Sequence, residues 1–269
     1  MIRKGTPIAH YIEQLEVLDM KGGNVLGSMD RVMDYVEWVH QVEGFLRALY
    51  ISSEPADRLF SDRHWRIAEH SAAQFTHKLL SAEVKLQRDR LRQMIEELKE
   101  LQAIGDRPGE LVILDTNVLL HFQRIDMVRW PKVVGVSTPL RLVIPVLVLD
   151  EMDERRYTGS PNVKKAARTA LKPLEERLAD IERQGYSYIS DNVTVEYLLA
   201  GGDKFPGNPD ADILDQAELL QHAANRAVTV VTGDHGMRQR AVVRGLKVAT
   251  MLPEFARDRD EAQGVMLDS

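Results

Sequence analysis

A short apolar run at residues 111–114, reading LVIL, ends abruptly in the polar sequence Asp115-Thr116-Asn117. Four apolar residues in a row are typical of a strand that is buried on both faces, as in a parallel sheet. Open parallel sheets bind their ligands at the carboxyl ends of the strands. Asp115 therefore stands at a place suited to function, although an acid here can also simply cap the helix that we expect next.

The second half of the chain repeats this alternation of apolar runs and amphipathic segments. The expected elements are strands at 142–145, 186–189, 193–197, 228–232 and 247–250, and helices at 146–156, 163–184, 210–226 and 235–244. Strands that alternate with helices predict an α/β fold with a central, mostly parallel sheet flanked by helices.

The first part of the chain predicts only helices, because apolar residues recur at helical spacing. The expected helical stretches are 8–15, 32–49 and 61–101. Val84, Leu91 and Leu98 follow seven-residue steps, which fit either a coiled-coil seam or a helical hairpin that packs on itself. We expect this part to be a partner or oligomerisation region through which the protein forms a homo-oligomer.

A domain boundary is indicated by the Gly- and Pro-containing sequence AIGDRPGE. The predicted order is an all-helical region at 1–104, a linker at 105–110, an α/β domain at 111–255 and a C-terminal tail at 256–269.

The composition excludes several classes of protein. With 44% hydrophobic and 28% charged residues, the chain of 269 residues has the balance of a globular protein. The absence of cysteine excludes disulfides, thiolate zinc sites and a cysteine nucleophile, and fits a reducing cytoplasm. We expect a cytoplasmic protein with no membrane partner, because no apolar run spans a bilayer and the start lacks a secretory signal. A net charge of −6 means that any nucleic-acid binding must use local basic clusters or bound cations.

Three acids are expected at one end of the sheet. Asp115 follows the first strand, and Asp234 follows the strand at 228–232. Asp210 opens a helix for which Asn208 can be the N-cap and Pro209 the first helical residue. Helical spacing turns Asp210 to the same side as the apolar residues of that helix. The helix dipole alone also favours an acid in the first turn, so the spacing leaves both roles open.

Glu151 is a fourth candidate, in the helix after the strand at 142–145, although by spacing alone Asp150 or Asp153 competes with it. A solvated helix face would explain such acids equally well. Carboxylates that converge repel one another unless cations hold them. Mg²⁺ or Mn²⁺ suits carboxylate and water oxygens, activates water and holds phosphate oxygens. Converging acids therefore predict metal-dependent phosphoryl chemistry, with hydrolysis as the simplest case.

Four stretches of the sequence, LVILDTNVLL, IPVLVLDEMDERR, PDADILDQA and VVTGDHGM, resemble the motif blocks of PIN-domain nucleases in the same order. The resemblance covers about residues 111–255 and leaves the helical first part unassigned. It implies a PIN-like fold and a Mg²⁺- or Mn²⁺-dependent nuclease that acts mainly on RNA. By this pattern the catalytic and metal-binding acids are Asp115, Glu151, Asp210 and Asp234, and the supporting polar residues are Asn117 and Thr232.

Basic residues near these motifs are candidate contacts for nucleic acid. They are Arg155, Arg156, Lys164, Arg168, Lys172, Arg238 and Arg240. Lys164, Arg168 and Lys172 step by four, so they share one helix face. The pair Arg155-Arg156 departs from the lysine that the family pattern leads us to expect. Solvated helix faces are the alternative explanation for these residues.

We therefore expect a divalent-metal-dependent endoribonuclease that cleaves single-stranded or structured RNA. The main alternative is a catalytically silent RNA-binding or assembly protein on the same fold. A haloacid-dehalogenase-like phosphatase would need a second Asp at the position of Asn117. The sequence contains no GxSxG, P-loop or HExxH pattern.

Overall fold

The computed structural model describes residues 7–50, 52–69, 76–137, 139–198 and 209–257. The chain divides into two compact units, Met1–Ala103 and Ile104–Ser269. Asn208, the predicted N-cap, and residues 258–269, most of the predicted C-terminal tail, lie outside the described residues. None of the described helices is both long and apolar enough to cross a membrane.

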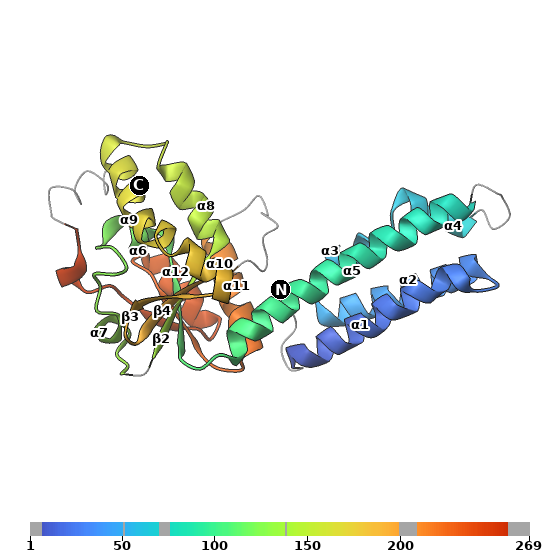
Figure 1. Cartoon of the computed structure of the whole chain (residues 1–269), viewed down its shortest axis with the longest axis horizontal. Coiled ribbons are helices and arrows are strands. Elements are labelled where there is room, and N and C mark those ends of the chain that lie inside the picture. Colours follow the sequence, from blue (N-terminus) through green and yellow to red (C-terminus); the bar gives the residue numbers. More distant parts are fainter. Residues whose placement is uncertain (1–6, 51, 70–75, 138, 199–208, 258–269) are drawn as a thin grey trace. The chain divides into compact units, whose positions relative to one another are not determined.

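The first unit is helical throughout its described part (Figure 1). Its elements are α1 (Ile8–Asn24), the 3-10 turn η1 (Val25–Gly27), α2 (Arg31–Leu49), α3 (Glu54–Asp57), α4 (Asp62–Glu69) and α5 (Thr76–Asp106), the end of which belongs to the second unit. Asp19 of α1 accepts hydrogen bonds from Arg88 and Arg92 of α5, at 2.8 and 3.2 Å.

The seven-residue steps on α5 are covered within the chain. Val84, Leu91 and Leu98 are at most 2% exposed. A seam that served a coiled coil with another chain would be exposed before association. The hairpin alternative therefore accounts for these three residues.

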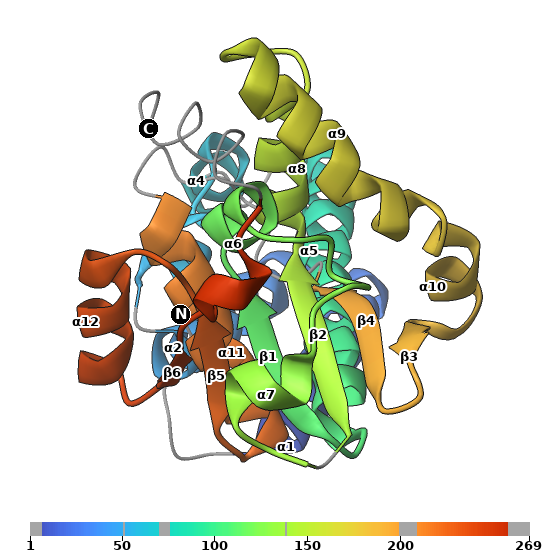
Figure 2. The same ribbon diagram turned by 90° about the vertical axis from the view of Figure 1, so that its left-hand side faces the viewer.

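The second unit contains a six-stranded sheet with the strand order β3-β4-β2-β1-β5-β6 (Figure 2). The strands are β1 (Glu110–Leu114), β2 (Leu140–Pro145), β3 (Ser187–Ser190), β4 (Val193–Leu198), β5 (Val228–Val231) and β6 (Lys247–Ala249). All neighbouring pairs are parallel except β3 and β4, which are antiparallel. This arrangement confirms the predicted α/β fold with a mostly parallel sheet, preceded by an all-helical region.

Helices connect the strands and cover the sheet. They are α6 (Thr116–His121), α7 (Trp130–Val134), α8 (Val146–Arg155), α9 (Pro161–Glu175), α10 (Leu178–Gln184), α11 (Pro209–Ala224) and α12 (His235–Val243), followed by the 3-10 turn η2 (Pro253–Phe255). The views in Figures 1 and 2 place α7 and α11 on opposite faces of the sheet. The side chains of residues 111–114 are 0% exposed, so β1 lies at the centre of the core.

The position of β1 fixes where a ligand can bind. The chain places β2 and β4 on one side of β1, and β5 and β6 on the other. Figure 2 shows β1, β2 and β5 running in the same direction, toward the end of the sheet where α6 and α8 lie. Open parallel sheets bind ligands at such a switch point, beyond the carboxyl ends of the strands.

The predicted single helix at 163–184 is wrong, because the structure divides it into α9 and α10. Pro173 has no N–H to donate and lies inside the last turn of α9. Four residues later the backbone N–H of Arg177 donates to the carbonyl of Leu174, at 3.1 Å. The carbonyl of Pro173 instead accepts from the guanidinium of Arg177, at 2.8 Å, so the regular helical hydrogen bonding ends there.

Candidate functional site

Asp115 lies at the carboxyl end of β1 and is 2% exposed. It occupies the N-cap position of α6, but its side chain makes no capping hydrogen bond. One carboxylate oxygen, Oδ2, instead accepts from the hydroxyl of Thr232 at 2.7 Å and from the side-chain amide of Asn117 at 3.4 Å. Both predicted supporting residues therefore contact this acid, and Thr232 does so from outside the helix that Asp115 precedes.

Thr232 connects the first acid to the last. It follows β5 and is 0% exposed. Its hydroxyl donates to Asp115 and accepts from the backbone N–H of Asp234 at 3.0 Å. Asp234 is the N-cap of α12, and its carboxylate accepts from the backbone N–H of Met237 at 2.6 Å. The beginning of α12 is thereby fixed relative to the end of β1.

Glu151 is the half-buried acid on α8, whereas Asp150 and Asp153 are exposed. The hydroxyl of Thr116 donates to Glu151 Oε2 at 2.8 Å, and Arg155 donates to Oε1 at 3.2 Å. Since Thr116 directly follows Asp115, its hydrogen bond connects the second acid, Glu151, to the end of β1.

Asp210 lies in the first turn of α11, which begins at Pro209 as predicted. It is half-buried, and the helix buries Ile213, Leu214 and Ala217 behind it. Arg240 of α12 donates to its Oδ2 at 2.7 Å.

The electrostatic effects connect these four acids. Burial is the main cause that raises the pKa of Asp115 to about 6; Asp210 and Glu151 raise it further, against the hydrogen bond from Thr232. The pKa of Asp210 is also raised, first by burial and then by Asp234 and Glu151, against the opposing effect of Arg240. Acids from β1, α8, α11 and α12 therefore share one end of the sheet.

Their donor set suits a hard divalent cation, although no preformed cage is present. In the described part of the chain, no group of three or more His, Cys, Asp or Glu side chains is arranged to hold a metal. The chemistry of the donors nevertheless fits Mg²⁺ or Mn²⁺, since all are carboxylate oxygens. Asp115 in particular is buried, and the described residues that donate to it are neutral, which leaves its charge uncompensated.

The predicted nucleic-acid contacts fall into three groups. Arg155 and Arg240 form ion pairs with Glu151 and Asp210, at 3.2 and 2.7 Å, and thus lie at the acids themselves. Arg156 pairs with Asp153 and Glu175, and Lys172 lies 4.0 Å from Glu176. Among the described residues, Lys164, Arg168 and Arg238 have no carboxylate partner. These three therefore keep their positive charge uncompensated.

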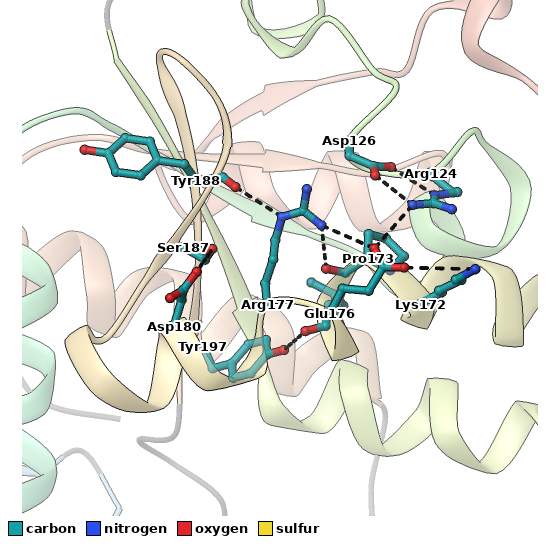
Figure 3. A network of polar contacts seen from close by, with 11 residues as sticks. Arg124, Asp126, Lys172, Pro173, Glu176, Arg177, Asp180, Ser187, Tyr188 and Tyr197 are labelled. Carbon is teal, nitrogen blue, oxygen red and sulfur yellow. Dashed lines mark hydrogen bonds and ion pairs between the residues drawn. The ribbon is translucent and has the colours of Figure 1, made fainter.

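The end of α9 is held by the polar network in Figure 3. Arg177 donates to the carbonyl oxygens of Tyr188 and Pro173, at 3.1 and 2.8 Å. Arg124 binds Asp126 at 2.8 Å and approaches Glu176 to 3.8 Å. The network joins α9 to β3 and to the segment after α6, which orients the basic face of α9 in the fold.

Thr116 is a site residue that the sequence motifs do not assign. It is 4% exposed and fixes Glu151 through its hydroxyl. The available signal was its position: a small hydroxyl residue that follows a strand-end acid and opens a helix.

Comparison with known proteins identifies a family for the region that carries the four motifs. Residues 112–252, just over half of the chain, match the family model described as PIN domain. A solved structure described as a domain of a functionally unknown protein from Methanocaldococcus jannaschii DSM 2661 matches 56% of this chain and 96% of its own, with 16% identity and a TM-score of 0.35. No curated protein matches the chain.

Proposed function

Since the chain belongs to the PIN-domain family, we propose that it is a divalent-metal-dependent nuclease that hydrolyses phosphodiester bonds in RNA. Members of this family are generally nucleases. The four acids at the end of the sheet are the proposed catalytic and metal-binding residues. Region 111–255 carries the activity in this proposal, and region 1–104 serves as a partner or oligomerisation region.

The observation that carries the proposal is the environment of Asp115. A buried carboxylate without a cation costs several kcal/mol unless it is protonated or finds a counter-charge. Here the neighbours within electrostatic range are two further acids, Asp210 and Glu151. A fold that gathers acids around a buried carboxylate is stabilised by a cation from solution.

The chain's own residues have separate roles around that cation. Asp115, Glu151, Asp210 and Asp234 would hold Mg²⁺ or Mn²⁺, which when bound activates water and polarises the phosphate. Thr232 and Thr116 orient Asp115 and Glu151 through hydroxyl groups, at 2.7 and 2.8 Å. Such outer contacts commonly decide metal affinity by about 10–100-fold. Lys164, Arg168 and Arg238 supply positive charge for the phosphates beyond the site.

The decisive experiment is a cleavage assay on single-stranded RNA, double-stranded RNA and single-stranded DNA, with Mg²⁺, Mn²⁺ or a chelator. We expect metal-dependent cleavage of RNA. Asp115→Asn and Asp234→Asn should each reduce the rate by more than ~100-fold, because each removes a proposed ligand rather than an outer contact. Asp191→Asn, which changes an exposed acid in the turn between β3 and β4, is the matched control and should keep the wild-type rate.

The result also separates the two candidate activities. A protein that binds RNA but cleaves none of these substrates with either metal is the silent assembly protein. Cleavage of DNA in preference to RNA would keep the nuclease and exclude RNA as its substrate. Wild-type rates in both Asp→Asn variants would contradict the assignment of the acids.

A further inference from the structure

Asp210 and Arg240 form an ion pair between two helices at the candidate site. Asp210 opens α11, Arg240 lies on α12, and the guanidinium nitrogen is 2.7 Å from Oδ2. The two side chains are 30% and 42% exposed, so solvent ions reach both partners. An ion pair with this exposure contributes little stability and exchanges readily.

The same guanidinium and the carboxylate of Asp234 approach the same point over Gly236. A Cβ atom at Gly236 would stand 3.2 Å from Arg240 Nη1 and 3.2 Å from Asp234 Oδ1. Arg240 thus extends back over the first turn of its own helix, through space that the missing side chain of Gly236 leaves open. It lies near two of the acids proposed as metal ligands, which come from different helices.

Arg244, at the C-cap of α12, provides a comparison. It pairs with Asp215 and lies 3.5 Å from Glu218, neither of which is a candidate ligand. Both arginines pair with a carboxylate on α11, but of the two only Arg240 pairs with an acid of the site. Any special role of Arg240 must therefore come from its place and not from its charge alone.

We propose that Arg240 is the counter-cation of Asp210 until a divalent ion binds, and that it then becomes a contact for a phosphate of the nucleic acid. The inference rests on the proposed function. A guanidinium and a divalent cation compete for the same carboxylate because like charges repel at close range. The displaced guanidinium remains beside the metal, where phosphate is the anion that it binds best, with two parallel hydrogen bonds.

This exchange couples the two ligands. Nucleic acid that engages Arg240 removes the competitor of the metal, so it should raise metal affinity. By thermodynamic linkage, the metal must raise the affinity for nucleic acid by the same factor. A partly exposed ion pair limits the factor to about two- to fivefold.

The test measures metal affinity and needs no cleavage. Mn²⁺ is titrated into the full chain by calorimetry, for the wild type, Arg240→Gln and Arg244→Gln, with and without a single-stranded oligonucleotide whose phosphorothioate linkages resist hydrolysis. Without oligonucleotide, Arg240→Gln should bind Mn²⁺ about two- to fivefold more tightly than the wild type. With oligonucleotide, the wild type should gain a similar factor and Arg240→Gln should gain none. Arg244→Gln should behave as the wild type.

Each outcome is decisive. Unchanged Mn²⁺ affinity in Arg240→Gln overturns the exchange and leaves the proposed function intact. Equal tightening in Arg240→Gln and Arg244→Gln also overturns it, because a general effect of charge would then explain the change. A wild type that binds no Mn²⁺ overturns the exchange together with the proposed metal site. Thermal melting of both variants checks that each is folded.

Discussion

Two buried carboxylates of the same sheet have opposite surroundings. Glu196 in β4 is 1% exposed; it receives two hydrogen bonds from Arg141, at 2.8 and 2.9 Å, and one from Arg107 at 2.8 Å. Asp115 after β1 is 2% exposed, and its donors among the described residues are the neutral groups of Thr232 and Asn117. Within the described residues, no lysine or arginine forms an ion pair with Asp115.

The difference separates a buried charge that the folded chain compensates from one that it leaves uncompensated. Burial of a charge is tolerated when the chain supplies a well-placed partner, as it does for Glu196. Asp115 has no such partner and lies near other acids, so the folded chain bears the cost of its ionisation. A cation from solution can therefore bind Asp115 without displacing a guanidinium, whereas Glu151 and Asp210 are paired with Arg155 and Arg240.

The largest expected effect on stability follows from removing the paired charge. Glu196→Gln should destabilise the second unit by about 3–5 kcal/mol, because Arg141, itself 2% exposed, is left without its counter-charge. Chemical denaturation with hydrogen exchange of the β2 and β4 amides would measure this. Glu182→Gln, an exposed acid on α10, is the control with the same change and should alter stability by less than about 0.5 kcal/mol. Equal losses of stability in Glu196→Gln and Glu182→Gln would contradict the role of the buried ion pair.

Asp115→Asn, in contrast, should stabilise the folded protein when no metal is bound. Because the folded pKa of Asp115 is raised to about 6, protonation favours the folded state. The contribution is fully present below the ordinary carboxyl pKa and is lost as pH rises through about 6, which costs at most about 3 kcal/mol. Asp115→Asn should therefore stabilise the chain at pH 8 in chelator and change it little at pH 4. The difference between the variant and the wild type, followed by denaturation at both pH values, isolates this group from all others that titrate. A variant less stable than the wild type at pH 8 would contradict the uncompensated charge.

Thr232→Val removes the hydroxyl that bridges Asp115 and the Asp234 backbone. We expect metal affinity to fall by about 10–100-fold, since outer contacts orient ligands. Thr232→Ser keeps the hydroxyl and should keep most of the affinity. Calorimetric titration with Mn²⁺ measures both, and equal losses would assign the effect to packing at this 0%-exposed position instead of the hydrogen bonds.

The smallest effect concerns cationic residues without an acidic partner. Lys164→Gln with Arg168→Gln should lower the slope of log affinity against log salt by about 0.7 for each contact with a single strand. The matched control is Lys132→Gln with Arg183→Gln. It also removes one lysine and one arginine charge, but these are paired with Glu254 and Asp180. Its slope should be that of the wild type. If only the control changes the slope, the nucleic acid lies elsewhere on the surface.

Much of the fold could be predicted from the sequence because hydrophobic patterning reports burial locally. The strand at 142–145 was predicted from its apolar run, but β2 begins at Leu140. The missing part contains Arg141, which resembles a loop residue until its partner Glu196, distant in the sequence, buries it. A short helix, α7, was likewise missed in a stretch that had no clear period.

The candidate site could likewise be predicted only in part from the sequence. Motif order predicted which acids to consider, and the structure places them at one end of the sheet. Motif order does not reveal that Arg155 and Arg240 bind Glu151 and Asp210, since such pairs depend on how side chains pack after folding. For the same reason the motifs do not assign Thr116 to the site, because its partner Glu151 lies on another helix.

The edges of the sheet bear on how the protein behaves in concentrated solution. β6 has three residues and β3 has four, with a register irregularity between Tyr188 and Ser190. The main-chain oxygen of Tyr188 is already bonded to the guanidinium of Arg177. Long, regular edges with open main-chain groups invite strand-to-strand aggregation, and these edges are neither long nor regular. Growth of this sheet from one molecule into the next is thereby disfavoured.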